Sequence, residues 1–191
     1  MKAGVILYGP PAAGKDTVTG ALNNLDPRFS LYHRLKCGSG RTETYRMITR
    51  AVLTKLHDAN EIIWENQQYG SLYAVDRTGL AAHLNDGVPV LHLGQVAAVD
   101  AVQLATPDTL WFVVGLWCSR DTASKRLEGR GSKDTSRRLA VWDATPPLGP
   151  PATTLNTDLI SAEDAADLIA ATIKRSVTND AYQSRLGTSP R

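Results

Sequence analysis

A glycine-bounded loop near the start of the chain limits the fold more than any other segment. It follows the apolar run from Ala3 to Tyr8 and reads Gly9-Pro-Pro-Ala-Ala-Gly14-Lys15-Asp16-Thr17. Glycines let the backbone turn tightly so that several N–H groups face one phosphate, and the N-terminus of a following helix adds a favourable dipole. A buried strand, this loop and a helix from about Lys15 to Leu25 together predict a phosphate-binding loop.

The residue types in the loop have distinct expected tasks. Lys15 would bridge the β- and γ-phosphates of ATP as a catalytic residue, and the hydroxyl of Thr17 would bind Mg²⁺. The general pattern has Ser or Thr directly after the lysine, whereas here Asp16 intervenes, an order similar to the Gly-Lys-x-Thr of adenylate and guanylate kinases. We therefore expect ATP and Mg²⁺ as cofactors, and the loop residues expected to contact them are Gly9, Pro10, Ala12, Ala13, Gly14, Lys15, Asp16 and Thr17.

Composition restricts the class of protein. The chain has 191 residues, 42% of them hydrophobic and 21% charged, which fits one globular domain. Its 21 basic and 19 acidic residues are too evenly balanced for a general nucleic-acid binder, and no apolar run approaches the length of a membrane span. The two distant cysteines predict reduced thiols. We expect a cytoplasmic protein, a monomer or homodimer, with neither a nucleic-acid nor a membrane partner.

Strands that alternate with helices predict an α/β fold with a parallel sheet covered on both faces. The interval 29–75 breaks the alternation and predicts a smaller lobe at one edge of the sheet. We expect a single domain over residues 1–176 and a flexible tail over 177–191. The other strands expected are Phe29–Leu35, Glu61–Trp64, Ser71–Val75, Val88–Leu93, Leu110–Leu116 and Thr153–Leu155. The other helices expected are Thr42–His57, Thr78–Leu84, Arg120–Glu128, Ser136–Asp143 and one from about Ser161.

A cluster of cations follows the predicted strand at Leu110–Leu116. Five basic residues surround a Gly-Ser break, namely Arg126, Arg130, Lys133, Arg137 and Arg138. Phosphoryl transfer between two polyanions needs positive charge that closes over the transferring group. The cluster predicts a hinged lid over about 129–137, although an ordinary exposed basic helix is the alternative.

Four segments, in order, resemble the guanylate kinase superfamily. They are Gly9 to Thr17; Glu61 to Glu65 with Tyr69-Gly70-Ser71-Leu72-Tyr73; Arg126-Leu-Glu-Gly-Arg130-Gly131 with Arg137-Arg138-Leu139; and Leu155-Asn156-Thr157-Asp158-Leu159. The resemblance implies the three-layer fold of P-loop kinases and ATP-dependent transfer to a small phosphorylated acceptor. It also implies that Arg130 and Arg138 are catalytic, that Arg126 and Asn156 contact ATP, and that Tyr73 contacts the acceptor.

The acceptor half departs from the guanylate kinase pattern. Those enzymes hold the acceptor phosphate with a Thr-Thr-Arg-x-x-Arg-x-Gly-Glu stretch. This chain has a shorter segment there, and the groups in it that can bind a phosphate are Arg34, Lys36, Arg41 and Tyr45. Trp64 stands where a base-reading glutamate is expected, with Glu65 one place later, and Gly94 stands where an aspartate is expected. GMP is therefore expected to be a poor acceptor.

A second branch of the superfamily, the ribose 1,5-bisphosphate phosphokinases, is similar in other places. The shared features are Gly14-Lys15-Asp16 before a hydroxyl residue, His33-Arg34 and Leu93-Gly94. A nucleoside monophosphate and ribose 1,5-bisphosphate both remain candidate acceptors. A true guanylate kinase and a noncatalytic protein-binding module remain alternatives, and Lys15, Thr17 and the arginine-rich lid argue against the module.

Overall fold

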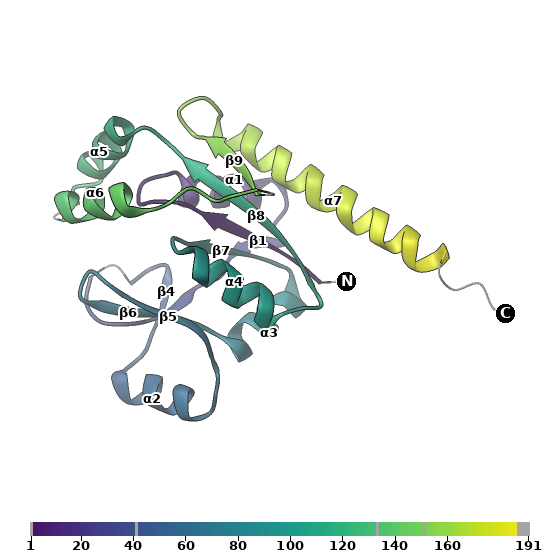
Figure 1. The fold of residues 1–191 in the computed structure, drawn as a ribbon, viewed down its shortest axis with the longest axis horizontal. Helices are drawn as coiled ribbons and strands as arrows, with labels where there is room; N and C mark the ends of the chain where they lie inside the picture. The colour runs from purple at the N-terminus through teal and green to yellow at the C-terminus, as the bar shows by residue number, and fades with distance from the viewer. Residues whose placement is uncertain (1, 41, 133, 151, 187–191) are drawn as a thin grey trace.

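A central sheet of five parallel strands organises the computed structural model, which describes residues 2–40, 42–132, 134–150 and 152–186 (Figure 1). The strand order is β2-β7-β1-β8-β9. The strands are Phe29–Leu31 (β2), Val88–Leu93 (β7), Lys2–Tyr8 (β1), Thr109–Trp117 (β8) and Thr153–Asn156 (β9). The predicted α/β class and parallel sheet are confirmed.

Helices cover both faces of this sheet and make three layers. Val5 and Leu7 of β1 pack with helices α1 (Lys15–Leu25) and α7 (Ala162–Leu186). Ile6 and Tyr8 face the opposite way, onto α3 (Arg77–Asp86) and α4 (Val96–Ala105). Successive strand residues point to opposite faces, so a continuous apolar run is what a strand buried on both sides requires.

A second sheet forms a small lobe beside the first. Its order is β4-β3-β6-β5, with strands Tyr45–Met47 (β4), Arg34–Cys37 (β3), Ser71–Asp76 (β6) and Ile62–Gln68 (β5). Helix α2 (Arg50–Asp58) packs on the lobe through Leu53, and Figure 1 shows it at the far end from the central sheet. The predicted lobe at 29–75 corresponds to this unit, apart from β2, which belongs to the central sheet.

The segments 29–57 and 94–109 differ from expectation. The predicted strand Phe29–Leu35 is two strands, because the chain leaves the central sheet after β2 and enters the lobe at β3. The predicted helix Thr42–His57 begins only at Arg50, where Thr49 Oγ1 accepts a hydrogen bond from Val52 N. Met47, which fits a helical apolar face, pairs instead with Lys36 of β3. Helix α4 was not predicted.

The C-terminal part of the chain holds two lid helices and the long last helix. The lid helices are α5 (Arg120–Gly129) and α6 (Thr135–Ala144), which lie together at one end of the central sheet in Figure 1. Helix α7 continues to Leu186, so helical backbone extends well into the region predicted as a tail. No helix in the described parts of the chain is long and apolar enough to cross a bilayer.

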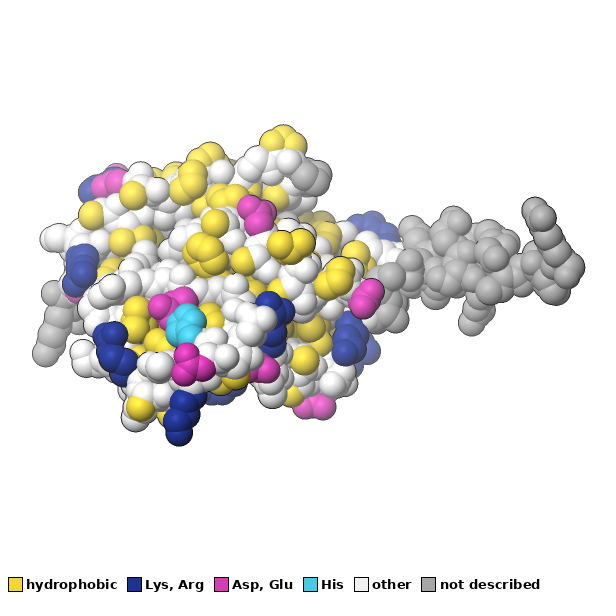
Figure 2. All heavy atoms as spheres, turned by 60° about the horizontal axis from the view of Figure 1, so that its bottom comes forward, with side chains coloured by type: hydrophobic (Ala, Val, Ile, Leu, Met, Phe, Trp, Pro, Cys, Tyr) yellow, Lys and Arg dark blue, Asp and Glu magenta, His cyan; other side chains and the backbone are white. Residues whose placement is uncertain are grey.

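Charge is mixed on the face shown in Figure 2. Basic and acidic side chains alternate there with neutral ones, and neither sign forms a continuous patch among the residues drawn in colour. This distribution agrees with the small formal net charge of +2.

Candidate active site

The phosphate loop connects the carboxyl end of β1 to the first turn of α1. Gly9 has φ 149°, and a Cβ there would lie 2.3 Å from the carbonyl oxygen of Leu116, so no larger residue fits. Gly14 has φ 94° at the N-cap of α1. Ala12 also has positive φ, at 62°, which is a strained conformation for a residue with a side chain. Strain of this kind concentrates at binding sites, where the surrounding fold enforces it.

Lys15 begins helix α1 and folds back over the loop. Its Nζ donates hydrogen bonds to the carbonyl oxygens of Gly9, at 2.6 Å, and Pro10, at 2.8 Å. Burial lowers the pKa of Lys15 to about 8, while the neighbouring Asp16 carboxylate acts in the opposite direction. A partly desolvated ammonium held beside the loop is well placed to exchange its carbonyl partners for phosphate oxygens.

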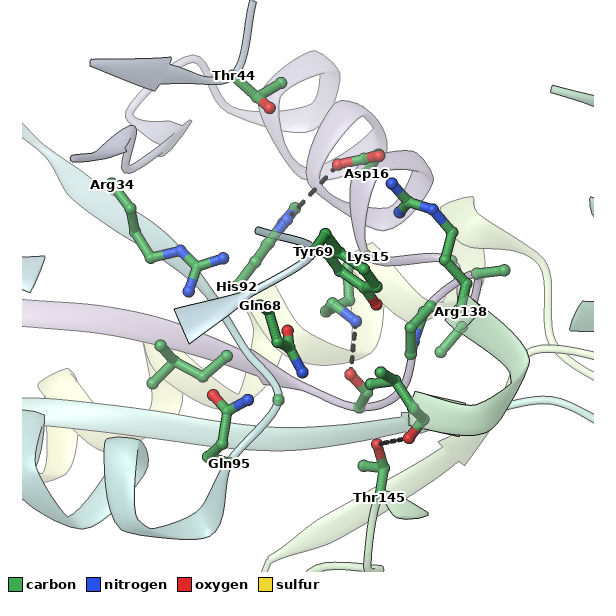
Figure 3. A pocket seen from close by; sticks show the side chains of 18 of the residues that line it. Lys15, Asp16, Arg34, Thr44, Gln68, Tyr69, His92, Gln95, Arg138 and Thr145 are labelled. Atoms are coloured by element: carbon green, nitrogen blue, oxygen red, sulfur yellow. Dashed lines mark hydrogen bonds and ion pairs between the residues drawn. The ribbon is translucent and has the colours of Figure 1, made fainter. Parts of the chain in front are cut away.

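A cavity opens in front of the loop, between the central sheet, the lobe and the lid (Figure 3). Ten predicted site residues line it, namely Gly9, Ala12, Ala13, Gly14, Lys15, Asp16, Arg34, Tyr45, Arg130 and Arg138. A second hollow adjoins it and shares Arg34, Tyr45 and Arg138, and the predicted residues Lys36 and Tyr73 complete its cationic and tyrosine lining. The predicted groups therefore converge from segments far apart in the sequence.

Strand pairing brings together four residues that were predicted to contact the acceptor. Arg34 and Lys36 are two residues apart on β3 and so share one face, while Tyr45 pairs with Arg34 and Tyr73 with Lys36. Lys36 is only 2% exposed, and its Nζ lies 5.2 Å from the ring centre of Tyr45 and 5.6 Å from that of Tyr73. Burial, followed by the charge of Arg138, lowers the pKa of Lys36. Arg41 lies outside the described residues.

The lid contributes Arg130 and Arg138. Arg130 caps the C-terminus of α5, and its Nη1 lies 3.9 Å from a carboxylate oxygen of Asp16. Arg138, on α6, donates to Asp134 at 2.6 Å and lies 4.7 Å from the ring centre of Tyr69. Tyr69 has φ 51° in the turn between β5 and β6, so the tip of a lobe hairpin meets the lid. The lid is therefore in contact with both the phosphate loop and the lobe.

Arg126 binds other residues of the protein and does not line the cavity. Its guanidinium donates to Ala12 O at 3.0 Å, to Thr157 Oγ1 at 3.0 Å and to Thr157 O at 2.9 Å. These bonds fix the phosphate loop against the turn after β9. Asn156, the last residue of β9, accepts a hydrogen bond from the backbone N–H of Asp158. Arg126, Asn156, Pro10 and Thr17 are not among the residues that line the two hollows described above.

Several cavity residues were not predicted. Gln68 ends β5, Gln95 follows β7, and His92 lies on β7. Figure 3 shows Gln68 and Gln95 directed into the same space as Arg34. The pairing of Leu7 with His92 brings β7 level with β1, so residues at the ends of both strands meet at the loop. An amide at a strand end carries no sequence signal of its own, which is why reasoning from the chain missed Gln68 and Gln95.

Comparison with solved structures finds a similar fold in kinases. The guanylate kinase from Anaplasma phagocytophilum is 18% identical, with a TM-score of 0.58 over 92% of this chain and 87% of that one. A gluconokinase from Sinorhizobium meliloti is 16% identical, with a TM-score of 0.53 over 96% and 98%. No protein-family model and no curated protein matches the sequence. The likeness is therefore one of fold.

Proposed function

We propose that this protein is a kinase that transfers the γ-phosphoryl group of ATP to a small phosphorylated acceptor. One arrangement carries the proposal: Lys15 and the tyrosine-lined Lys36 border adjoining hollows, with Arg138 lining both. Phosphoryl transfer needs a donor and an acceptor positioned in line, with cations around the transferring group. The cavity supplies cations from three elements that can serve the donor, the acceptor and the group between them.

The donor side is the phosphate loop. The first turn of α1 and Lys15 would bind the ATP phosphates, and Arg126 would keep the loop in shape through its bonds to Ala12 and Thr157. The cavity also offers a carboxylate, Asp16, a hard oxygen ligand of the kind that Mg²⁺ accepts together with nucleotide phosphates. Mg²⁺ bound with ATP neutralises charge on the phosphate oxygens during transfer.

The acceptor side has a cationic end and a neutral end. Arg34, Lys36 and the phenols of Tyr45 and Tyr73 would hold the acceptor phosphate. The neighbouring Gln68 and Gln95 amides would bind the rest of the acceptor. Among the described residues that line these two hollows, the carboxylates are Asp16 and Asp134, and the latter pairs with Arg138. The two amides can donate hydrogen bonds to, and accept them from, the hydroxyl groups of an acceptor.

Lid closure would bring Arg130 and Arg138 to the transferring group. Both side chains are partly exposed, and both already line the cavity. Solved kinases named for different acceptors, a guanylate kinase and a gluconokinase, share this fold.

A panel of acceptors incubated with γ-labelled ATP and Mg²⁺ tests the proposal. The panel contains GMP, AMP, CMP, UMP and ribose 1,5-bisphosphate, and labelled product is separated from inorganic phosphate. We expect label in at least one phosphorylated acceptor and a low specificity constant for GMP. Absence of transfer to every acceptor, with folded protein that does not bind ATP, would contradict the proposal and favour a noncatalytic module.

A further inference from the structure

Two adjacent residues of α1 lie in different surroundings. Asp16 lines the cavity, with its side chain 37% exposed, whereas Thr17 is exposed and lies outside that lining. Consecutive residues of a helix point about 100° apart, so Asp16 and Thr17 face different directions. Figure 3 shows Asp16 directed from the first turn of α1 toward His92. The hydroxyl that the sequence assigns to Mg²⁺ is thus poorly placed, and a carboxylate stands nearer the phosphate loop.

We propose that Asp16, and not Thr17, is the side chain through which this protein binds the divalent cation of Mg–ATP. This inference rests on the proposed ATP-dependent function. It concerns a position where the general P-loop pattern has a hydroxyl and this chain has a carboxylate.

The electrostatics of the cavity carry the argument. The Asp16 carboxylate lines the same cavity as Lys15, the residue before it in the first turn of α1. Its oxygens also lie 3.5 Å from His92 Nδ1 and 3.9 Å from Arg130 Nη1. These groups surround the place where triphosphate oxygens would bind. A carboxylate there repels a metal-free triphosphate, and a cation between the two anions turns that repulsion into attraction.

The chemistry of the ligand set agrees with magnesium. Mg²⁺ is usually bound through one or two carboxylates together with substrate phosphates and water. Within the described residues no group of three or more His, Cys, Asp and Glu side chains could hold a metal ion. Asp16 would therefore act as one protein ligand beside the phosphates. A simpler role, in which Asp16 only stabilises the positive end of α1, predicts no link between this residue and the metal.

Binding measurements without turnover separate these roles. The dissociation constant of a non-hydrolysable ATP analogue is measured by calorimetry with Mg²⁺ and again with EDTA, for the wild type and for Asp16→Asn. We expect the wild type to bind much more tightly with Mg²⁺. In Asp16→Asn the affinity in EDTA should rise and the affinity with Mg²⁺ should fall, so that the ratio shrinks at least tenfold. Asp100→Asn, an exposed acid on α4, is the matched control and should keep the wild-type ratio.

A second readout follows the metal itself. Electron paramagnetic resonance of Mn²⁺ with the analogue should show weaker protein-bound Mn²⁺ in Asp16→Asn than in Asp100→Asn. Asp16→Ser, which restores the usual Lys-Ser order, should raise the affinity in EDTA and keep much of the metal dependence. Asp16→Ser also replaces Asp16→Asn in both measurements if Asp16→Asn does not fold.

The outcomes that overturn the inference are distinct from failure of the proposed function. An unchanged ratio in folded Asp16→Asn, or a ratio that collapses in Thr17→Val instead, contradicts the role of Asp16 alone. A wild-type protein that binds the analogue in neither condition contradicts the proposed kinase function.

Discussion

Glu65 Oε2 lies 2.9 Å from Nε2 of His57, on the face of β5 that packs toward α2 and away from the cavity. Gln68, three residues further along β5, lines the cavity, and Trp64 packs with the core on that same inner side. Successive strand residues alternate between faces, so Glu65 cannot replace the base-reading glutamate without a shift in register. The finding bears directly on the choice of acceptor.

We predict that GMP is a poor acceptor. Two missing carboxylate partners cost about 1–3 kcal/mol each, which together is roughly thirtyfold to more than ten-thousandfold in specificity constant. Competition kinetics of GMP against ribose 1,5-bisphosphate and other nucleoside monophosphates measure this. Gly94→Asp tests the missing aspartate directly. The substitution should be tolerated, because a Cβ at position 94 would make an ordinary 3.7 Å contact with Gly9 O. It should raise the specificity constant for GMP about tenfold, and a clear GMP preference in the wild type would refute our description of the pocket.

Lys15→Ala should abolish detectable transfer while the protein stays folded. The ammonium donates hydrogen bonds to the loop carbonyls of Gly9 and Pro10, and its removal would deprive the transferring group of a preorganised cation worth about a hundredfold to a thousandfold in rate. Single-turnover transfer and circular dichroism are the measurements. Lys55→Ala, on the exposed side of α2, is the control and should retain full activity. Near-normal turnover in folded Lys15→Ala would remove the central claim.

Arg130→Ala and Arg138→Ala should lower kcat far more than they raise the KM for ATP. Lid arginines act on charge that develops in the transition state, and loss of one costs on the order of a thousandfold. Arg175→Ala, on the exposed part of α7, serves as the control. If both lid variants change KM and leave kcat intact, these residues bind the ground state and the lid assignment is wrong.

Lys36→Met should weaken binding of the acceptor without lowering the stability of the protein. Loss of a charged hydrogen-bond donor should raise the acceptor KM by about tenfold to a hundredfold. Burial already disfavours the ammonium and lowers the pKa of Lys36, so an apolar side chain of similar length should not lower the melting temperature. Lys55→Met is the matched control. Unaltered acceptor KM would show that the phosphate binds elsewhere.

Stability should depend on the ionisation of Asp76. Burial acts to raise its pKa, but hydrogen bonds from Arg46 and Tyr32 outweigh burial, so the folded-state pKa lies below the ordinary value of 3.8. Between the two values the unfolded chain binds more protons, so the free energy of unfolding rises with pH there and is lost as pH falls. Denaturant titrations of wild type and Asp76→Asn at pH 7 and pH 3 test this.

The variant Asp76→Asn leaves the buried part of Arg46 without its anion and should cost on the order of 3 kcal/mol at pH 7. The difference from wild type should shrink at pH 3. Asp86→Asn, an exposed acid at the end of α3, is the control and should show little change at either pH. An equal loss at both pH values would mean that charge is not what Asp76 contributes.

The central sheet and the phosphate loop were predictable because their signals are local. The run Val5 to Tyr8 is apolar on both faces of the strand. The start of α1 follows from Gly14, which ends the loop, and Lys15, which begins the helix. The lobe was harder. Strand β4 has three residues, too few to show a period of two, and its pairing with β3 spans residues 34 to 47. Local pattern contains no information about which distant strand will provide such a partner.

Site residues that belong to a sequence motif were predictable. Residues whose role depends on the direction in which the side chain points were not. Lys15, Arg130 and Arg138 were expected, and all three line the cavity. Asp16 lines the cavity and Thr17 does not, because of the rotation of α1 about its own axis where it joins the loop. A sequence motif contains no information about that rotation. Gln68 and Gln95 line one cavity although Gln68 ends β5 of the lobe sheet and Gln95 follows β7 of the central sheet.

The chain enters and leaves the small lobe at a single place. Tyr32 lies where β2 gives way to β3, Asp76 lies where β6 ends, and the Tyr32 hydroxyl donates to Asp76 Oδ1 at 2.6 Å. An insertion whose two ends touch can be exchanged without lengthening any connection in the host. Residues 33–75 therefore form an insertion with adjoining ends, and exchange of this segment at the one junction would replace the small lobe while the central sheet and the phosphate loop remain as they are.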